Sequence, residues 1–104
     1  MGALYQLKFA NGKSYIGLTY GKPDKRFRQH KANLKSGVDL PIYRAWNKYG
    51  EPTFSILAIV EDSLLAETEI KAISKYETLV PNGYNVSFGG DVSPMKNSEV
   101  VKRQ

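Results

Sequence analysis

The sequence predicts an α+β domain in which helices pack against a small antiparallel sheet. Three observations lead to this class. Two short segments near the start of the chain alternate, are rich in strand formers and flank an Asn-Gly pair, as in a β-hairpin. Three later segments carry proline, aspartate or glycine where helices start and stop. A mostly apolar run of strand length separates the last two helices, which gives the order β-β-α-α-β-α.

The individual elements follow from local signals. Asp24 is the expected cap of the first helix, and Asp62 or Ser63 that of the last. A turn at 81–83 and a short extended piece at 84–88 come after the last helix. In chain order the predicted elements are strands over 3–9 and 14–19, a helix from Pro23 to Gly37, a helix from Leu40 to Gly50, a strand over 53–60 and a helix reaching about Glu77.

The Asn-Gly turn permits two registers of the hairpin. A two-residue loop would pair Ala10 with Lys13 and place Tyr5 and Tyr15 on opposite faces of the sheet. A three-residue loop would pair Phe9 with Lys13 and place both tyrosines on one face. The hairpin signal itself favours neither register.

Length and composition exclude several classes of protein. The 104 residues suit one domain, which we place at 1–90, and the polar stretch 91–104 has the composition of a linker where a longer protein was truncated. With no cysteine and one histidine, a thiolate zinc site, a cysteine nucleophile and a His-rich metal site are excluded. The sequence shows no secretory signal and no apolar run of roughly 18 residues, so we expect a cytoplasmic protein that is not secreted and binds no membrane.

The net charge of +5 is concentrated in one block. Residues 22–48 carry eight basic residues against two acidic ones, whereas residues 49–80 carry six acidic residues against two basic ones. Such a block is typical of phosphate neutralisation, although a solvated helix face has the same composition. The candidates for contact with nucleic-acid phosphates are Lys25, Arg28, Lys31, Lys35, Arg44 and Lys48.

Two helices carry polar residues that a purely structural interpretation does not require. In the last helix, Glu69 lies four residues from both Leu65 and Ile73, in the middle of an apolar face that also includes Ala72 and Tyr76. A carboxylate buried there needs a cation, a hydrogen-bond network or a metal to compensate it. In the first helix, the spacing of four residues puts Arg26 and His30 on one face.

Six short motifs follow one another along the chain: Ala3-Leu4-Tyr5, Tyr15-Ile16-Gly17, Lys25-Arg26-Phe27-Arg28-Gln29-His30, Trp46-Asn47-Lys48-Tyr49-Gly50, Glu69 and Asn82-Gly83-Tyr84-Asn85. In this order they resemble the motifs of the GIY-YIG nucleases. The second tripeptide matches fully, whereas the first keeps its tyrosine and has Ala-Leu in place of Gly-Ile. Some homing enzymes of the family carry a second histidine where this chain has Val38-Asp39-Leu40. The resemblance implies a three-stranded antiparallel sheet flanked by helices, with both tyrosines on one face.

The resemblance also implies an active site and its chemistry. By motif position the active-site residues are Tyr5, Tyr15, Arg26, His30, Glu69 and Asn85. Glu69 would be the ligand of Mg²⁺ or Mn²⁺, and Arg26 would bind the scissile phosphate. We prefer Tyr5 as the general base with His30 assisting, and His30 as the base is the alternative. Tyr15 and Asn85 would hold the geometry of the water and the phosphate.

The implied function is a metal-dependent DNA endonuclease that nicks one strand of double-stranded DNA per active site. The Trp46–Gly50 stretch favours the N-terminal catalytic domain of a homing endonuclease, located in the cytoplasm, nucleoid or nucleus with its DNA. We expect a monomeric isolated domain that needs no small-molecule cofactor. The alternatives are a structure-specific repair or restriction nuclease of the same family, and a non-catalytic nucleic-acid-binding module.

Overall fold

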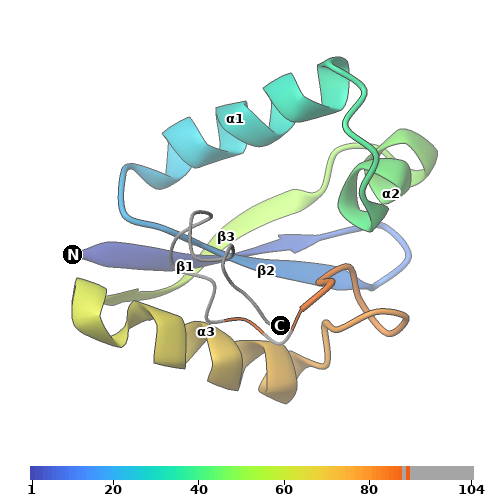
Figure 1. Cartoon of the computed structure of the whole chain (residues 1–104). Coiled ribbons are helices and arrows are strands. Elements are labelled where there is room, and N and C mark those ends of the chain that lie inside the picture. The colour runs from blue at the N-terminus through green and yellow to red at the C-terminus, as the bar shows by residue number, and fades with distance from the viewer. Residues whose placement is uncertain (88, 90–104) are drawn as a thin grey trace, which may run out of the picture.

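The computed structural model describes residues 1–87 and 89 (Figure 1). Its elements occur in the predicted order and close to the predicted positions. They are β1 (Gly2–Lys8), β2 (Ser14–Thr19), α1 (Pro23–Lys35), α2 (Pro41–Tyr49), β3 (Thr53–Val60) and α3 (Asp62–Tyr76). The three strands form one antiparallel sheet in the order β2-β1-β3, so β2 and β3 are its edge strands. The predicted α+β class with a three-stranded antiparallel sheet is confirmed.

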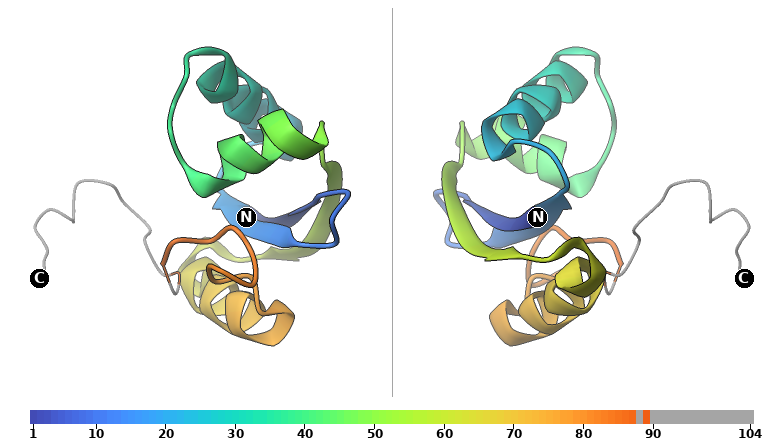
Figure 2. Two further views of the ribbon diagram at one scale, coloured as in Figure 1. Left: turned by 90° about the vertical axis from the view of Figure 1, so that its right-hand side faces the viewer. Right: turned by 90° about the vertical axis from the view of Figure 1, so that its left-hand side faces the viewer.

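The sheet lies between two helical layers. Helices α1 and α2 cover one face, and α3 covers the other (Figures 1 and 2). This arrangement follows from the alternation of side chains along β1. Tyr5 and Leu7 belong to an apolar cluster with Trp46 of α2, whereas Leu4 belongs to a second cluster with Ile73 of α3. Both faces of β1, the central strand, are therefore buried.

The hairpin between β1 and β2 has the three-residue loop. The N–H of Phe9 donates to the carbonyl of Lys13 at 2.9 Å, and the N–H of Gly12 donates to the carbonyl of Phe9 at 2.9 Å. Gly12 has φ 89°, in the left-handed region that glycine adopts without strain. In this register Tyr5 and Tyr15 share one face, with their ring centroids 6.4 Å apart. The register that the family resemblance favoured is confirmed.

The helix caps differ from the prediction. Asp24 lies in the first turn of α1, and the N-cap is Lys22, which makes no side-chain cap hydrogen bond. The N-cap of α3 is Glu61, so neither Asp62 nor Ser63 caps that helix. Both predicted caps are wrong because each helix begins one or two residues earlier than the cap rule assumed. Asp24 and Asp62 still lie in first turns, where a negative charge interacts favourably with the helix dipole.

The segment after α3 runs along the free edge of β2. The N–H of Tyr84 donates to the carbonyl of Ser14 at 2.9 Å, and Leu79 and Asn85 form an isolated bridge. Residues 84–87, the described part of the extended piece predicted over 84–88, form no strand. Residues 88 and 90–104, which include the predicted linker 91–104, lie outside the described residues. Within residues 1–87 and 89, no helix has the length and apolar character needed to cross a membrane.

Candidate active site

Four of the six predicted site residues line one cavity at the free edge of β2. The cavity has a volume of about 250 Å³, and Tyr15, Arg26, Glu69 and Asn85 all contribute to its wall. Arg26 reaches it from α1 on one face of the sheet, and Glu69 reaches it from α3 on the other. The two helical layers therefore meet around the edge strand, and the cavity combines a guanidinium, a carboxylate and a phenol.

The other two predicted residues, Tyr5 and His30, lie buried beside this cavity. Their exposed fractions are 0% and 2%. The hydroxyl of Tyr5 is 2.6 Å from Nε2 of His30, and it accepts a hydrogen bond from Nε of Arg26 at 3.3 Å. Because Arg26 also lines the cavity, it connects the buried pair to the carboxylate side of the site.

Gly17 makes room for Tyr5. The two residues face each other across the β1–β2 pair. A Cβ atom placed on Gly17 would collide with the phenol end of Tyr5. The glycine that ends the Tyr15-Ile16-Gly17 tripeptide therefore lets the Tyr5 ring lie against the backbone of β2.

Asn85 completes the edge of β2. Its Oδ1 accepts the N–H of Ile16 at 2.8 Å, and its Nδ2 donates to the carbonyl of Ile16 at 2.8 Å. An edge strand leaves such backbone groups unpaired, so this one amide takes the place of a neighbouring strand. Since Ile16 follows Tyr15, Asn85 holds the stretch of β2 that presents Tyr15 to the cavity.

Burial sets the protonation states of the site. It raises the pKa of Tyr15 to about 12, against the charge of Arg26, which lowers it, while the carboxylate of Glu69 raises it further. Burial also raises the pKa of Tyr5 well above its ordinary value, with Arg26 again opposing the shift. Burial acts to lower the pKa of Arg26, but the neighbouring phenols, Tyr5 first and then Tyr15 and Tyr43, outweigh this effect and raise it. At neutral pH the guanidinium is charged and both phenols are protonated.

The imidazole of His30 is neutral at physiological pH. Burial, followed by the positive charge of Arg26, lowers its pKa from 6.5 to about 4. The ring lies between the aromatic rings of Tyr5, Tyr15 and Tyr43, with centroid distances of 5.9, 5.6 and 5.9 Å. A charged imidazolium would thus be poorly solvated there and would face a guanidinium.

This environment predicts an acid-dependent loss of stability. In the unfolded chain His30 binds a proton near pH 6.5, whereas in the folded protein it does so only near pH 4. Between these two pH values the unfolded state binds more protons than the folded state. The contribution of neutral His30 to the free energy of unfolding is therefore fully present above pH 6.5 and is lost as the pH falls to about 4. Each unit of difference between the two pKa values corresponds to about 1.4 kcal/mol, so the free energy of unfolding can fall by roughly 3 kcal/mol.

Urea unfolding of the wild type and of His30→Gln, from about pH 7 to about pH 4, measures this contribution. Carboxylates titrate in both proteins, so the difference between the two pH dependences isolates His30. The wild type should lose more unfolding free energy than the variant. Parallel curves would contradict the buried neutral imidazole.

Glu69 has the position that helical spacing predicted. It is 9% exposed, on the α3 face that also buries Leu65 and Ile73. Tyr76, expected on the same face, is 45% exposed, so that part of the prediction is wrong. Tyr76 lies at the last residue of α3, where the helix extends beyond the apolar cluster formed with the sheet.

The cavity fits a hydrated divalent ion. Within the described part of the chain, no group of three or more His, Cys, Asp or Glu side chains gathers to hold a metal. Glu69 is the carboxylate of the cavity, and Mg²⁺ accepts one carboxylate while keeping most of its waters. A volume of about 250 Å³ also leaves room for several waters at about 30 Å³ each. The residues present therefore suit an oxygen-ligated ion held by Glu69, water and substrate.

The basic residues predicted to contact phosphate are exposed on α1 and α2. Three of them form surface ion pairs, which join Arg28 to Asp24, Lys31 to Glu51 and Arg44 to Asp39. Both members of each pair are largely exposed, so these pairs are weak and leave the cations accessible to phosphate. Contact with DNA through Lys25, Arg28, Lys31, Lys35, Arg44 and Lys48 stays a prediction.

The sequence interpretation missed two residues that contact the site. The hydroxyl of Tyr43, from α2, is 2.8 Å from Nδ1 of His30 and accepts a hydrogen bond from Nδ2 of Asn33 at 3.0 Å. Asn33 follows His30 by three residues, so helical spacing could have placed it on the same face of α1. No local signal could have identified Tyr43, because its contact depends on how α2 packs against α1.

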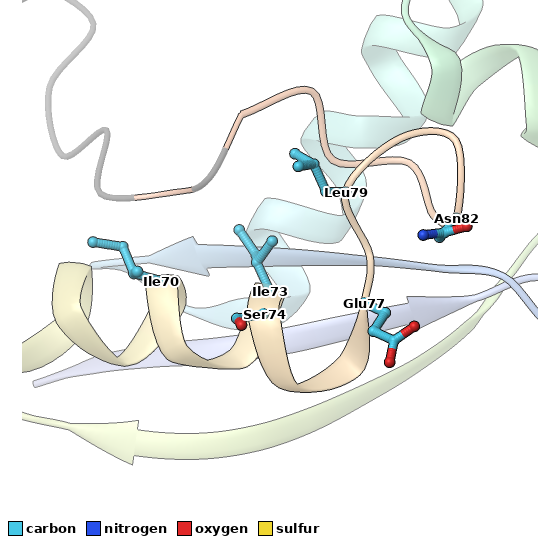
Figure 3. A pocket seen from close by; sticks show the side chains of 6 residues that line it. All are labelled: Ile70, Ile73, Ser74, Glu77, Leu79 and Asn82. Atoms are coloured by element: carbon cyan, nitrogen blue, oxygen red, sulfur yellow. The ribbon is translucent and has the colours of Figure 1, made fainter.

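A second, larger cavity lies between α3 and the loop that follows it, and it carries none of the six predicted site residues. Its volume is about 470 Å³, and it is lined by Ile70, Ile73, Ser74, Glu77, Leu79 and Asn82 (Figure 3). The larger volume does not make it the better site. It lacks the combination of guanidinium, carboxylate and phenol that the cavity at β2 provides.

Comparisons with known proteins agree with this geometry. A family model described as the GIY-YIG catalytic domain matches residues 1–85. The chain is similar to a solved structure of the catalytic domain of the homing endonuclease I-TevI, with 29% identity and a TM-score of 0.73 over 84% of this chain and 99% of that chain. It is also similar to a Glu-to-Ala mutant of the catalytic domain of the intron endonuclease I-TevI, with 30% identity and a TM-score of 0.73 over 84% of this chain and 95% of that chain. The search of curated protein sequences found no match.

Proposed function

This chain belongs to the GIY-YIG family of nuclease catalytic domains, and we propose that it is a divalent-metal-dependent DNA endonuclease that cuts one strand of double-stranded DNA per active site. The observation that carries the proposal is the convergence of Tyr15, Arg26 and Glu69 on one cavity from three different elements. Hydrolysis of a phosphodiester needs an activated water, donors for the charged phosphate and help for the departing 3′ oxygen. The three side chains are the residue types that these tasks require.

Glu69 would hold the ion, Mg²⁺ or Mn²⁺, which when bound supplies positive charge to the phosphate and to the leaving oxygen. Arg26 is the second source of positive charge. Its guanidinium stays protonated, and its planar fork can donate two hydrogen bonds to one phosphate. Because Nε of Arg26 donates to Tyr5, the guanidinium is held in place before substrate arrives.

The attacking water needs a proton acceptor, and the two tyrosines differ in their access to it. Tyr15 lines the cavity together with Glu69, whereas Tyr5 is fully buried with its hydroxyl between His30 and Arg26. This geometry favours Tyr15 as the phenol in contact with water. Tyr5, which the family resemblance favoured as the base, would then belong to the buried hydrogen-bond network behind Tyr15. Positive charge from Arg26 and the ion lowers the cost of forming the phenolate.

Within the family, the homing endonuclease is the best-supported biological role for this chain. The two similar structures are catalytic domains of a homing or intron endonuclease, and the alignment spans nearly all of each. By this proposal residues 1–90 are the catalytic domain, and the exposed cations of α1 and α2 bind the DNA backbone. Double-strand breaks would then need two nicking events or two copies of the domain.

Supercoiled plasmid tests the proposed activity directly. The domain, in excess over plasmid, should convert it to nicked circles before linear DNA in the presence of Mg²⁺ or Mn²⁺, and EDTA should stop the reaction. A gel-shift assay on the same plasmid reports binding separately. If the plasmid stays supercoiled in the presence of metal although the protein binds it, the domain is a nucleic-acid-binding module and not a nuclease.

A further inference from the structure

The wall of the cavity at β2 offers few side-chain oxygens that could bind a cation together with Glu69. Among the described residues that line it, four side chains carry an oxygen atom: Tyr15, Glu69, Asn85 and Ser87. Mg²⁺ and Mn²⁺ are hard ions that take oxygen ligands. A second side-chain ligand from this cavity must therefore be the phenol, the amide or the hydroxyl.

Two of these three groups have other tasks. Asn85 is 6% exposed, and both polar atoms of its amide are bonded to the backbone of Ile16 at 2.8 Å. Burial raises the pKa of Tyr15 to about 12, so the phenol is protonated at neutral pH. In the proposed reaction this phenol faces the attacking water. The hydroxyl of Ser87 is the group that remains.

Ser87 is connected to the carboxylate of Glu69 through Gly89. The N–H of Gly89 donates to Oγ of Ser87 at 3.4 Å, and a Cβ atom placed on Gly89 would lie 3.2 Å from Oε1 of Glu69. Gly89 has φ 99°, in the left-handed region that favours glycine, and its missing Cβ leaves space beside the carboxylate. The hydroxyl and the carboxylate therefore belong to the same part of the cavity wall.

The chemistry of a serine hydroxyl suits an ion that keeps most of its waters. Ser87 is exposed, so its side chain can rotate about χ1 to meet a hydrated ion. A hydroxyl oxygen has two acceptor lone pairs and can bind a cation while it accepts a hydrogen bond. One Ser or Thr hydroxyl and one carboxylate also hold Mg²⁺ in P-loop nucleotide hydrolases, where phosphate and water take the other positions.

We propose that Ser87 is the second side-chain ligand of the divalent ion, whose hydroxyl oxygen binds the ion together with the carboxylate of Glu69. This inference rests on the metal dependence in the proposed function and adds the residue that orients the ion. An ion bound by one carboxylate can shift around it, whereas a second oxygen restricts that movement. The positions that face Tyr15 and Arg26 then stay open for water and phosphate.

Mn²⁺ binding without DNA tests this ligand directly. The paramagnetic ion broadens the NMR signals of nearby amides, so titration of ¹⁵N-labelled protein gives a dissociation constant. The wild type should first lose signals around Glu69 and Ser87. Ser87→Ala should bind Mn²⁺ about tenfold more weakly, and Glu69→Gln should lose the site. Ser55→Ala, at an exposed position of β3, is the matched control and should bind as the wild type does.

Thermal unfolding checks that these variants fold, and Ser87→Ala should unfold at the wild-type temperature because its side chain is exposed. Equal Mn²⁺ affinity of the wild type and Ser87→Ala would overturn the proposal and leave Glu69 as the ligand. A wild type that loses no signals around Glu69 at millimolar Mn²⁺ would also overturn it, whereas the plasmid assay would still decide whether the domain cuts DNA.

A cysteine at position 87 gives a measurement that a purely structural role would not change. The chain contains no cysteine, so Ser87→Cys introduces a single thiol, and Cd²⁺ is a soft ion that prefers thiolate ligands. The ultraviolet absorption of the sulfur–cadmium bond reports binding. Ser87→Cys should bind Cd²⁺ at least about tenfold more tightly than Ser55→Cys, whose partner on β1 is Gln6 and not an acid. Adding Glu69→Gln should remove this difference. Equal affinities of the two single thiols would overturn the proposal.

The nicking assay separates this inference from the proposed function. If the wild type is a nuclease, Ser87→Ala should need about tenfold more Mg²⁺ for half of its maximal rate. A wild type that binds Mn²⁺ through both side chains and does not nick plasmid would support the ligand and count against the nuclease alone. If Ser87→Ala is slower at every Mg²⁺ concentration but binds Mn²⁺ as the wild type does, the hydroxyl contacts the phosphate and the proposal is overturned.

Discussion

Glu69→Gln is expected to abolish metal-dependent nicking while leaving the fold and DNA binding intact. Glutamine has nearly the same size as glutamate, so the surrounding cavity is retained. The Glu69 side chain lines that cavity together with Ile73, and its Oε1 would lie 3.2 Å from a Cβ atom placed on Gly89. The neutral amide cannot supply the anionic oxygen that a hard divalent ion requires. Loss of the ion removes several kcal/mol of charge stabilisation, which corresponds to roughly a thousandfold or more in rate.

Single-turnover nicking of supercoiled plasmid measures this loss, and thermal unfolding checks the fold. Glu67→Gln is the matched control, because Glu67 precedes Glu69 by two residues on α3 and pairs with Lys71 at the exposed surface. It should cleave at the wild-type rate. If Glu69→Gln cleaves within tenfold of the wild type, Glu69 is not the metal ligand. Lost DNA binding in the variant would point instead to a damaged fold.

Arg26→Ala should lower the nicking rate by a factor of about 10² to 10³, the effect of removing one charged donor from a preorganised site. The guanidinium has two tasks, since it faces the cavity and donates through Nε to the hydroxyl of Tyr5. Removing it takes positive charge from the phosphate and also weakens the orientation of Tyr5. The loss should fall mainly on kcat, because the surface cations that bind DNA are unchanged.

Arg26→Lys separates the charge from the geometry. Lysine keeps the positive charge but lacks the Nε donor and the bidentate fork, so its rate should lie between those of the wild type and Arg26→Ala. Lys71→Gln is a control for the loss of one positive charge on an exposed helix face, and it should cleave normally. A rate for Arg26→Ala within tenfold of the wild type would contradict its contact with the phosphate.

The fold was largely predictable because its signals are local. Strand and helix positions follow from alternation and from proline and glycine at helix ends, and all six elements lie near their predicted places. The burial of Glu69 also followed from the spacing of apolar residues along α3. The helix caps were less predictable, because Lys22 and Glu61 occupy the cap positions without making the side-chain hydrogen bond on which the cap rule relies.

The hairpin register shows where local signals end. The Asn-Gly turn is compatible with two loops that differ by one residue, and the two loops place Tyr5 and Tyr15 on opposite faces or on the same face. Packing decides between them, because the observed register buries Tyr5 and Leu7 in the cluster under α1 and α2. A slip of one residue would send these apolar side chains to the other face. The motif resemblance favoured the same register, since it implied a site that needs both phenols.

By itself, the sequence determined the type of each element and the residues that carry charge and hydroxyl groups, since these depend on spacing within one segment. Only the tertiary structure decided that α1 and α3 lie on opposite faces of the sheet yet bring Arg26 and Glu69 to the same edge of β2. It also decided that Tyr43 of α2 contacts His30. Such contacts join residues far apart in the chain, and they form where the packing of two helical layers around one edge strand places them.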